Sequence, residues 1–147
     1  MRLAQEKAAA VAQQFPEDLI IGSDQVAMLA GQQLTKPGGR ANAIRQLRAA
    51  SGQAVTFYTS VCVLNSATNE SGTDLDRTIV HFRPLTNAQI EAYVDRDQPF
   101  DCAGGFKSES LGVVLFEKIE GEDPNALIGL PMIRLIRLLE TFGVTVI

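Results

Sequence analysis

Cysteine and histidine are scarce in this chain, and their scarcity excludes some kinds of site. The 147 residues include two cysteines and one histidine. Cys62 and Cys102 lie far apart and show no metal-ligand spacing, which argues against a metal centre built on thiolates. We therefore expect two reduced and mostly buried thiols. His81 has no Ser or Cys at a recognisable spacing, so we expect an ordinary strand residue there.

The chain also lacks a long apolar run and an excess of basic residues. No run approaches the roughly 20 apolar residues that a membrane-spanning helix requires, and the first residues contain no apolar signal core. We therefore expect a cytoplasmic protein with no membrane partner. The formal net charge of −4 argues against a broad surface for a nucleic-acid polymer. A few Lys and Arg residues could still form a small phosphate pocket.

Helix and strand signals alternate along the chain. The predicted helices are residues 2–14, 40–51, 86–94 and 132–142, with Thr86 as an N-cap; the predicted strands are residues 19–29, 54–64, 73–83, 113–119 and 144–147, and residues 31–39 are a predicted loop. The first strand is predicted as one bent strand or two short ones. Helices that alternate with a hairpin predict one α/β domain with a mixed central β-sheet flanked by helices.

The segment Gly22-Ser23-Asp24-Gln25 is the first that could carry chemistry. It follows an apolar run, 19–21, that is typical of a strand buried on both faces. A carboxylate directly after a buried strand, beside a flexible glycine, can bind a divalent cation or accept a proton from water. The alternative is that Asp24 only accepts hydrogen bonds from the backbone of a turn.

Three further segments contain charged residues in glycine-rich surroundings. Lys36, in a Pro/Gly loop, could hold phosphate as a point charge or could be a solvated lysine. Lys107 and Glu109 follow two glycines and alternate along the chain, so they could face one ligand; the alternative is an exposed glycine loop. Residues 121–131 have carboxylates that could help to bind metal, although a loop leading into a helix is the simpler interpretation.

The order of these motifs is more specific than any one of them. From the N-terminus they read Arg2-Leu3-Ala4-Gln5-Glu6-Lys7-Ala8, Ile21-Gly22-Ser23-Asp24-Gln25, Lys36-Pro37, Ala103-Gly104-Gly105-Phe106 and Asn125-Ala126-Leu127-Ile128-Gly129-Leu130-Pro131. Motifs in this order resemble the Maf family of nucleotide pyrophosphatases, and the resemblance covers essentially the whole chain. It implies a Maf/ITPase-like fold with a cleft between two lobes.

The resemblance also implies an activity and a cofactor. Members of the family hydrolyse a nucleoside triphosphate between its α- and β-phosphates with a divalent metal, Mg²⁺ or Mn²⁺. By the match of motifs, Asp24 would accept the proton of the attacking water and bind the metal, and Lys7 and Lys36 would hold phosphate. The expected partner is a small-molecule nucleotide.

One stretch narrows the expected substrate. Gln25 and Glu109 match positions that the family uses for base selection, and Lys107 lies in the same stretch as Glu109. Residues 102–110, CAGGFKSES, resemble the branch that acts on 7-methyl-GTP, whereas the branch acting on dTTP and UTP has a sequence similar to KAGAYGIQG. Because methylated guanine is cationic, the negative Glu109 is expected to favour it, and Phe106 could stack on the base.

The sequence departs from the family pattern at its start. Family members begin with an apolar strand and a Ser-Pro-Arg-Arg loop, which this sequence lacks. The arginines of that loop would neutralise the triphosphate, so weak or no activity is expected from the chain as it stands. An open sheet edge would also favour a homodimer. Two other hypotheses are a nucleotide-binding regulator of cell division or septum formation, which would not need Asp24, and a non-catalytic α/β scaffold.

Overall fold

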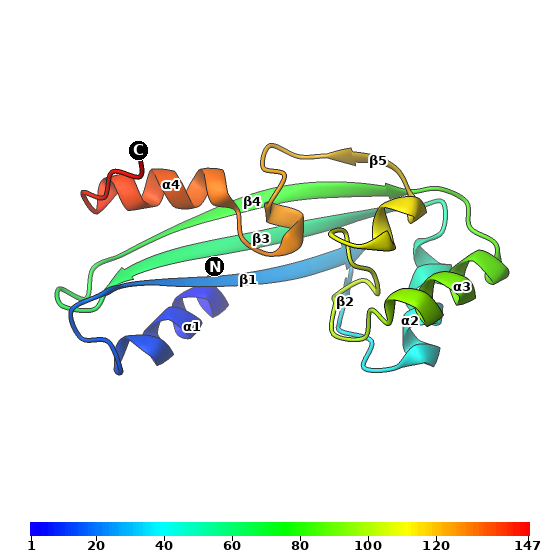
Figure 1. The fold of residues 1–147 in the computed structure, drawn as a ribbon, viewed down its shortest axis with the longest axis horizontal. Helices are drawn as coiled ribbons and strands as arrows, with labels where there is room; N and C mark the ends of the chain where they lie inside the picture. Colours follow the sequence, from blue (N-terminus) through cyan, green and yellow to red (C-terminus); the bar gives the residue numbers. More distant parts are fainter. The chain divides into compact units, whose positions relative to one another are not determined.

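The computed structural model describes residues 1–147. Its α-helices are α1 (Arg2–Ala12), α2 (Arg40–Ala50), α3 (Asn87–Asp97) and α4 (Met132–Thr141), and its 3₁₀ helices are η1 (Leu111–Leu115) and η2 (Ala126–Ile128). Its strands are β1 (Leu19–Leu29), β2 (Gln32–Leu34), β3 (Ala54–Asn65), β4 (Ser71–Phe82) and β5 (Phe116–Glu120) (Figure 1). None of the helices is both long and apolar enough to cross a membrane.

The strands form one five-stranded sheet in the order β2-β1-β3-β4-β5. The α/β class and the helix-flanked sheet are confirmed. The strands pair antiparallel where a mixed sheet was expected; β1 continues directly into β2 and β3 into β4, whereas helices lie between β2 and β3 and between β4 and β5. The chain divides into two compact units, and each long strand contributes residues to both. Unit 1 contains Met1–Gln25, Tyr58–Arg77 and Glu122–Ile147; unit 2 contains Val26–Phe57 and Thr78–Gly121.

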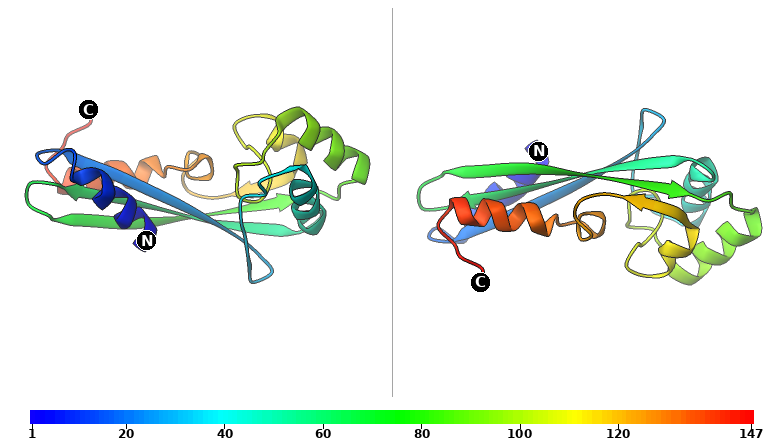
Figure 2. Two further views of the ribbon diagram at one scale, coloured as in Figure 1. Left: turned by 90° about the horizontal axis from the view of Figure 1, so that it is seen from below. Right: turned by 90° about the horizontal axis from the view of Figure 1, so that it is seen from above.

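Unit 1 has one helix on each face of its part of the sheet (Figure 2). Alternate residues of a strand point to opposite faces. Cys62 of β3 therefore lies in a core cluster with Ala8 of α1, whereas its neighbour Val61 lies in another cluster with Leu135 of α4. Burial on both faces explains why β3 is an almost continuous apolar run in the sequence.

Unit 2 has a cluster of aromatic rings in its core. Phe106 lies edge-to-face with Phe57, Phe82 and Phe116, with ring centroids 4.9 to 5.5 Å apart. Such pairs add to the stabilisation that burial provides. Phe106 is only 4% exposed, so it is a core residue rather than a surface on which a base could stack.

The predicted elements are present, with three local differences. The segment predicted as loop 31–39 contains β2, which pairs with β1. The strand predicted at 113–119 begins as η1, because the backbone N–H of Gly112 donates to Lys107 O at 2.9 Å and turns the chain there. The predicted strand 144–147 is absent, because the N–H of Val144 donates back to Leu139 O at 3.0 Å and closes the end of α4.

The N-cap prediction for α3 is confirmed in detail. The backbone N–H of Gln89 donates to Oγ1 of Thr86 at 3.2 Å, and the Oε1 of Gln89 accepts from the N–H of Thr86 at 2.9 Å. This capping box pairs two donors that would otherwise be left unpaired at the start of the helix. It fixes where α3 begins, and Gln98, in the left-handed backbone conformation, follows its last residue, Asp97.

Candidate active site

A carboxylate and an ammonium group meet on β1 in unit 1. The Nζ of Lys7, on α1, lies 2.7 Å from Oδ1 of Asp24 and 3.2 Å from the carbonyl oxygen of Ser23. The Asp24 side chain is 17% exposed and the Lys7 side chain 57%, so a ligand can reach the ammonium group. Gly22 permits this approach, because a Cβ there would lie 2.2 Å from the carbonyl oxygen of Ala4 in α1.

The side-chain amide of Gln25, next to Asp24, has a fixed orientation. Its Nε2 lies 3.0 Å from Oγ1 of Thr59 and 3.0 and 3.1 Å from the carbonyl oxygens of Ala126 and Leu127. Carbonyl oxygens only accept, and the Thr59 hydroxyl donates its own proton to Ala126 O. All three neighbours therefore require the NH₂ group at this position. Toward a ligand, Gln25 presents Oε1 and acts as an acceptor.

Ser23, on the other side of Asp24, lies between β3 and the loop that follows η2. Its Oγ is 2.8 Å from Ser60 O and 2.7 Å from Gly129 O. The hydroxyl of Ser60 in turn donates to the backbone oxygen of Asp24 at 3.2 Å. These bonds fix the backbone on which the Asp24 carboxylate stands, because they tie it to two other segments of unit 1.

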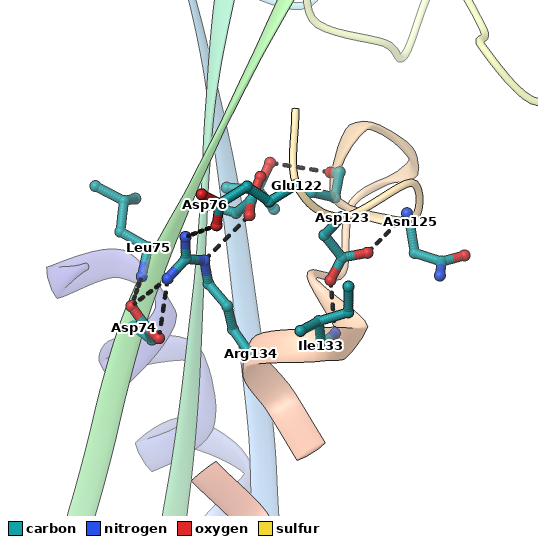
Figure 3. A network of polar contacts seen from close by, with 10 residues as sticks. Asp74, Leu75, Asp76, Glu122, Asp123, Asn125, Ile133 and Arg134 are labelled. Atoms are coloured by element: carbon teal, nitrogen blue, oxygen red, sulfur yellow. Dashed lines mark hydrogen bonds and ion pairs between the residues drawn. The ribbon is translucent and has the colours of Figure 1, made fainter. Parts of the chain in front are cut away.

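Asp123 shapes the loop, residues 121–131, whose carbonyl oxygens accept hydrogen bonds from Ser23 and Gln25 (Figure 3). The residue is 3% exposed, and its carboxylate accepts from the backbone N–H of Asn125 at 2.9 Å and of Ile133 at 2.6 Å. The second bond caps the start of α4, where a carboxylate is favoured. The structure therefore supports the interpretation of 121–131 as a loop leading into a helix.

Arg134 ties α4 to β4 through a network of carboxylates (Figure 3). Its guanidinium lies 3.1 Å from Asp76, 3.3 Å from Asp74 and 3.1 Å from Glu122. The hydrogen bond to the buried Asp76 raises the pKa of Arg134, and the one to Asp74 adds to this. The network holds Glu122, the second residue of the loop, to the same helix that Asp123 caps.

The side chains of the structure do not form a metal cage. No group of three His, Cys, Asp or Glu side chains could hold a metal ion. Oδ1 of Asp24 is paired with Lys7, and Oδ2 makes no hydrogen bond within the chain. Mg²⁺ is commonly held by one or two carboxylates together with substrate phosphates and water. The donor set therefore fits a cation that a nucleotide helps to hold.

The other predicted site residues lie in unit 2, around Cys102. Burial and then the negative charge of Glu109 raise the pKa of this thiol, whereas the charges of Lys107 and Lys36 lower it. These charged residues belong to two loops of unit 2. The backbone N–H of Gly38 donates to Phe100 O at 2.9 Å and joins those loops. Lys36, Lys107 and Glu109 therefore lie in the same unit, on loops that this hydrogen bond joins.

The residues that hold the candidate site residues in place belong to none of the motifs in the sequence. Thr59 and Ser60 are 1% and 4% exposed, and the available signal was two hydroxyl residues within an otherwise apolar strand. Tyr93 and Asp97 of α3 contact the segment that contains Lys107, and a helical pattern alone could not reveal this. Their roles depend on contacts between segments distant in the sequence.

A helix on each face of an antiparallel sheet, with charged groups on an inner strand, defines the chain as an α/β protein with a candidate site on β1. A family model described as "Maf-like protein" matches residues 1–142. The chain belongs to the Maf family.

Relatives match almost the whole chain. A 7-methyl-GTP pyrophosphatase of Alcanivorax borkumensis is 58% identical over 144 residues, which cover 98% of this chain and 73% of the relative. Proteins with the same name from Vibrio vulnificus and Hahella chejuensis are 54% and 51% identical, and cover 100% and 99% of this chain and 75% and 73% of the relatives.

Proposed function

We propose that this chain is a hydrolase of acid anhydrides that converts 7-methyl-GTP and water to 7-methyl-GMP and pyrophosphate. The observation that carries the proposal is the Asp24 carboxylate on β1, paired with Lys7 at 2.7 Å. The family and the names of the relatives support the same reaction. They do not favour a regulator without catalysis. Removal of altered nucleotides from the cellular pool would be the physiological outcome.

Asp24 is the proposed proton acceptor. Oδ1 is held by Lys7, so Oδ2 can take the proton from a water molecule as its oxygen attacks phosphorus and the bond between the α- and β-phosphates breaks. The Lys7 ammonium has three N–H donors, and two of them bind Asp24 and Ser23. The third is available to a phosphate oxygen, whose negative charge it would stabilise.

A divalent cation, Mg²⁺ or Mn²⁺, is part of the proposal. When bound with the nucleotide, it would neutralise charge on the triphosphate. Asp24 is the residue of this chain that would help to hold it. Lys36 is proposed to add positive charge for the phosphates.

Base selection is proposed to involve acceptors that meet the donors of methylated guanine. The Oε1 of Gln25 is the free end of an amide whose NH₂ group is already bonded. The Glu109 carboxylate has no cationic partner within hydrogen-bonding distance; its one side-chain hydrogen bond is with the Ser108 hydroxyl at 3.4 Å. Guanine has N–H donors on its base-pairing edge, and methylation makes it cationic, so both properties favour such acceptors.

The proposal is tested by pyrophosphate release from 7-methyl-GTP, with Mg²⁺ and with Mn²⁺, at high enzyme concentration. Asp24→Asn keeps the shape of the side chain but removes its charge, and the rate should fall by about 10²- to 10⁴-fold. Glu6→Gln is the matched control, because Glu6 is an exposed acid on α1 whose partner is Arg2 at 3.2 Å; its rate should equal that of the wild type. A wild-type rate in Asp24→Asn would contradict the role of Asp24.

A further inference from the structure

The last turn of α3 holds a loop that contains two of the candidate site residues. We name residues 107–112 the selector loop. The backbone N–H of Lys107 donates to the Tyr93 hydroxyl at 2.8 Å, and its Nζ donates to Asp97 O at 3.0 Å. The Asp97 carboxylate accepts from the Ser110 hydroxyl at 2.6 Å and from the N–H of Leu111 at 3.2 Å. One turn of helix therefore contacts both ends of this loop.

The selector loop also closes on itself. The carbonyl oxygen of Lys107 accepts from the N–H of Gly112 at 2.9 Å and from the N–H of Ser110 at 3.3 Å. Gly112 is required for this closure, because a Cβ there would lie 2.2 Å from Lys107 O. Glu109 stands at the middle of the closed loop and is exposed. The direction of its carboxylate therefore depends on how the loop is held.

Asp97 occupies a position where a carboxylate is normally disfavoured. It is the last residue of α3, and the C-terminal end of a helix repels negative charge. Its carboxylate is paired with two donors of the selector loop and with no cation, while the Lys107 ammonium binds the backbone oxygen at the same turn. A carboxylate at this end of the helix is favourable only when the selector loop supplies these two donors. The conformation of the loop is therefore coupled to α3 through Asp97.

We infer that Asp97, together with Tyr93, is a positioning residue for base selection, which acts by holding Glu109 in the direction that meets the base. The inference rests on the proposed function, because it concerns the same nucleotide. Tyr93 is 4% exposed, and burial raises the pKa of its hydroxyl, so the hydroxyl stays protonated and neutral at physiological pH. One turn of α3 thus holds the loop on which the exposed Glu109 stands.

The test is the ratio of kcat/KM for 7-methyl-GTP to kcat/KM for UTP, measured on one preparation of each full-chain variant. Asp97→Ala should lower this ratio about five- to tenfold, as expected from losing two hydrogen bonds to the loop. Asp97→Asn should keep most of it, because an amide can accept from Leu111 and donate to the Ser110 hydroxyl instead. Partial unfolding lowers both rates equally and leaves the ratio unchanged, so the ratio separates positioning from a structural role.

The control lies on the same helix. Asp95→Ala removes an exposed acid whose partner is Arg40 at 2.6 Å, and it should leave the ratio unchanged. If Asp97→Ala does not fold, Ser110→Ala and Tyr93→Phe, which each remove one bond, should lower the ratio by a smaller factor. An unchanged ratio in the folded Asp97 and Tyr93 variants, with a lowered ratio in Glu109→Gln, would overturn the inference and leave the proposed function intact.

Failure of the wild type to bind 7-methyl-GTP would instead count against the proposed function. A wild type that binds 7-methyl-GTP without measurable turnover can still be tested. In that case the ratio of dissociation constants for 7-methyl-GTP and UTP, obtained by calorimetric titration, replaces the kinetic ratio. Asp97→Ala should lower the preference by the same factor. An unaltered preference in Asp97→Ala would overturn the inference by this route as well.

Discussion

Unit 1 and unit 2 hold their charged side chains in different ways. In unit 1, Arg134 is 22% exposed and contacts three carboxylates, one of which, Asp76, is 1% exposed. In unit 2, the pair of Arg40 and Asp95 is more than half exposed. The Asp24 side chain, in unit 1, is largely buried, whereas the Glu109 side chain, in unit 2, is exposed. The comparison indicates that the proposed proton acceptor stands on a backbone fixed from several sides, whereas the proposed base-selecting acid depends mainly on one helix turn.

The largest expected effect comes from breaking the buried network. Arg134→Met should lower the free energy of unfolding by about 3 kcal/mol, because it removes the cation that compensates the charge of a buried carboxylate. Arg40→Met, the counterpart in unit 2, should change stability little, because water screens an exposed pair. Urea denaturation of both variants measures the difference. Equal losses of stability would mean that the two networks do not differ as described.

A somewhat smaller effect is expected where α1 approaches β1. Gly22→Ala should lower the free energy of unfolding by about 2 kcal/mol, because the added methyl group would collide with the backbone of Ala4 and displace the helix that carries Lys7. Gly39→Ala is the control in unit 2: a Cβ there meets nothing within 4 Å, and the cost should be at most about 1 kcal/mol at this N-cap. A stable Gly22→Ala variant would show that the helix can move aside freely.

The smallest expected effect is on the reactivity of the Cys102 thiol in unit 2. Burial raises the pKa of both thiols, and Glu109 raises that of Cys102 further. Alkylation by iodoacetamide requires the thiolate, so its rate should increase with pH up to values above the ordinary pKa of a thiol. Cys102 should react faster than the fully buried Cys62. Glu109→Gln should speed the reaction of Cys102 about two- to fivefold, and Lys107→Met should slow it.

Mass spectrometry of the alkylated peptides provides the measurement. It reports each cysteine separately, so Cys62 serves as an internal control for unfolding. If Glu109→Gln does not alter the rate at Cys102, the carboxylate does not lie near this thiol, and the grouping of the unit 2 residues would need revision.

Local pattern was sufficient to predict most of the helices and strands, including strand structure over residues 19–29, which contain Asp24. The apolar period and turn residues determine these features within a few neighbouring residues. The pairing of Lys7 with Asp24 could not be derived by pattern, because it requires that α1 crosses β1 closely at Gly22. The family resemblance predicted both residues as part of one site, and the structure adds the contact between them.

The supporting residues escaped prediction for the same reason. Thr59 fixes the Gln25 amide from a neighbouring strand, and Asp97 holds the selector loop from a helix. Each makes its bond to a segment that sequence spacing cannot place beside it. The strand predicted at 113–119 shows that a local pattern can also be overridden. Its valines fit a strand pattern, but the hydrogen bond that closes the selector loop at Gly112 turns the backbone, and the segment begins as η1.

The placement of Tyr93 has a spectroscopic consequence. The chain has no tryptophan and two tyrosines, and Tyr58 belongs to unit 1 while Tyr93 lies under the selector loop in unit 2. In a Tyr58→Phe variant, ultraviolet-excited emission would come almost wholly from one ring whose hydroxyl accepts a backbone proton of that loop. The intensity and lifetime of this emission would then report, without any attached dye, when the loop leaves its helix.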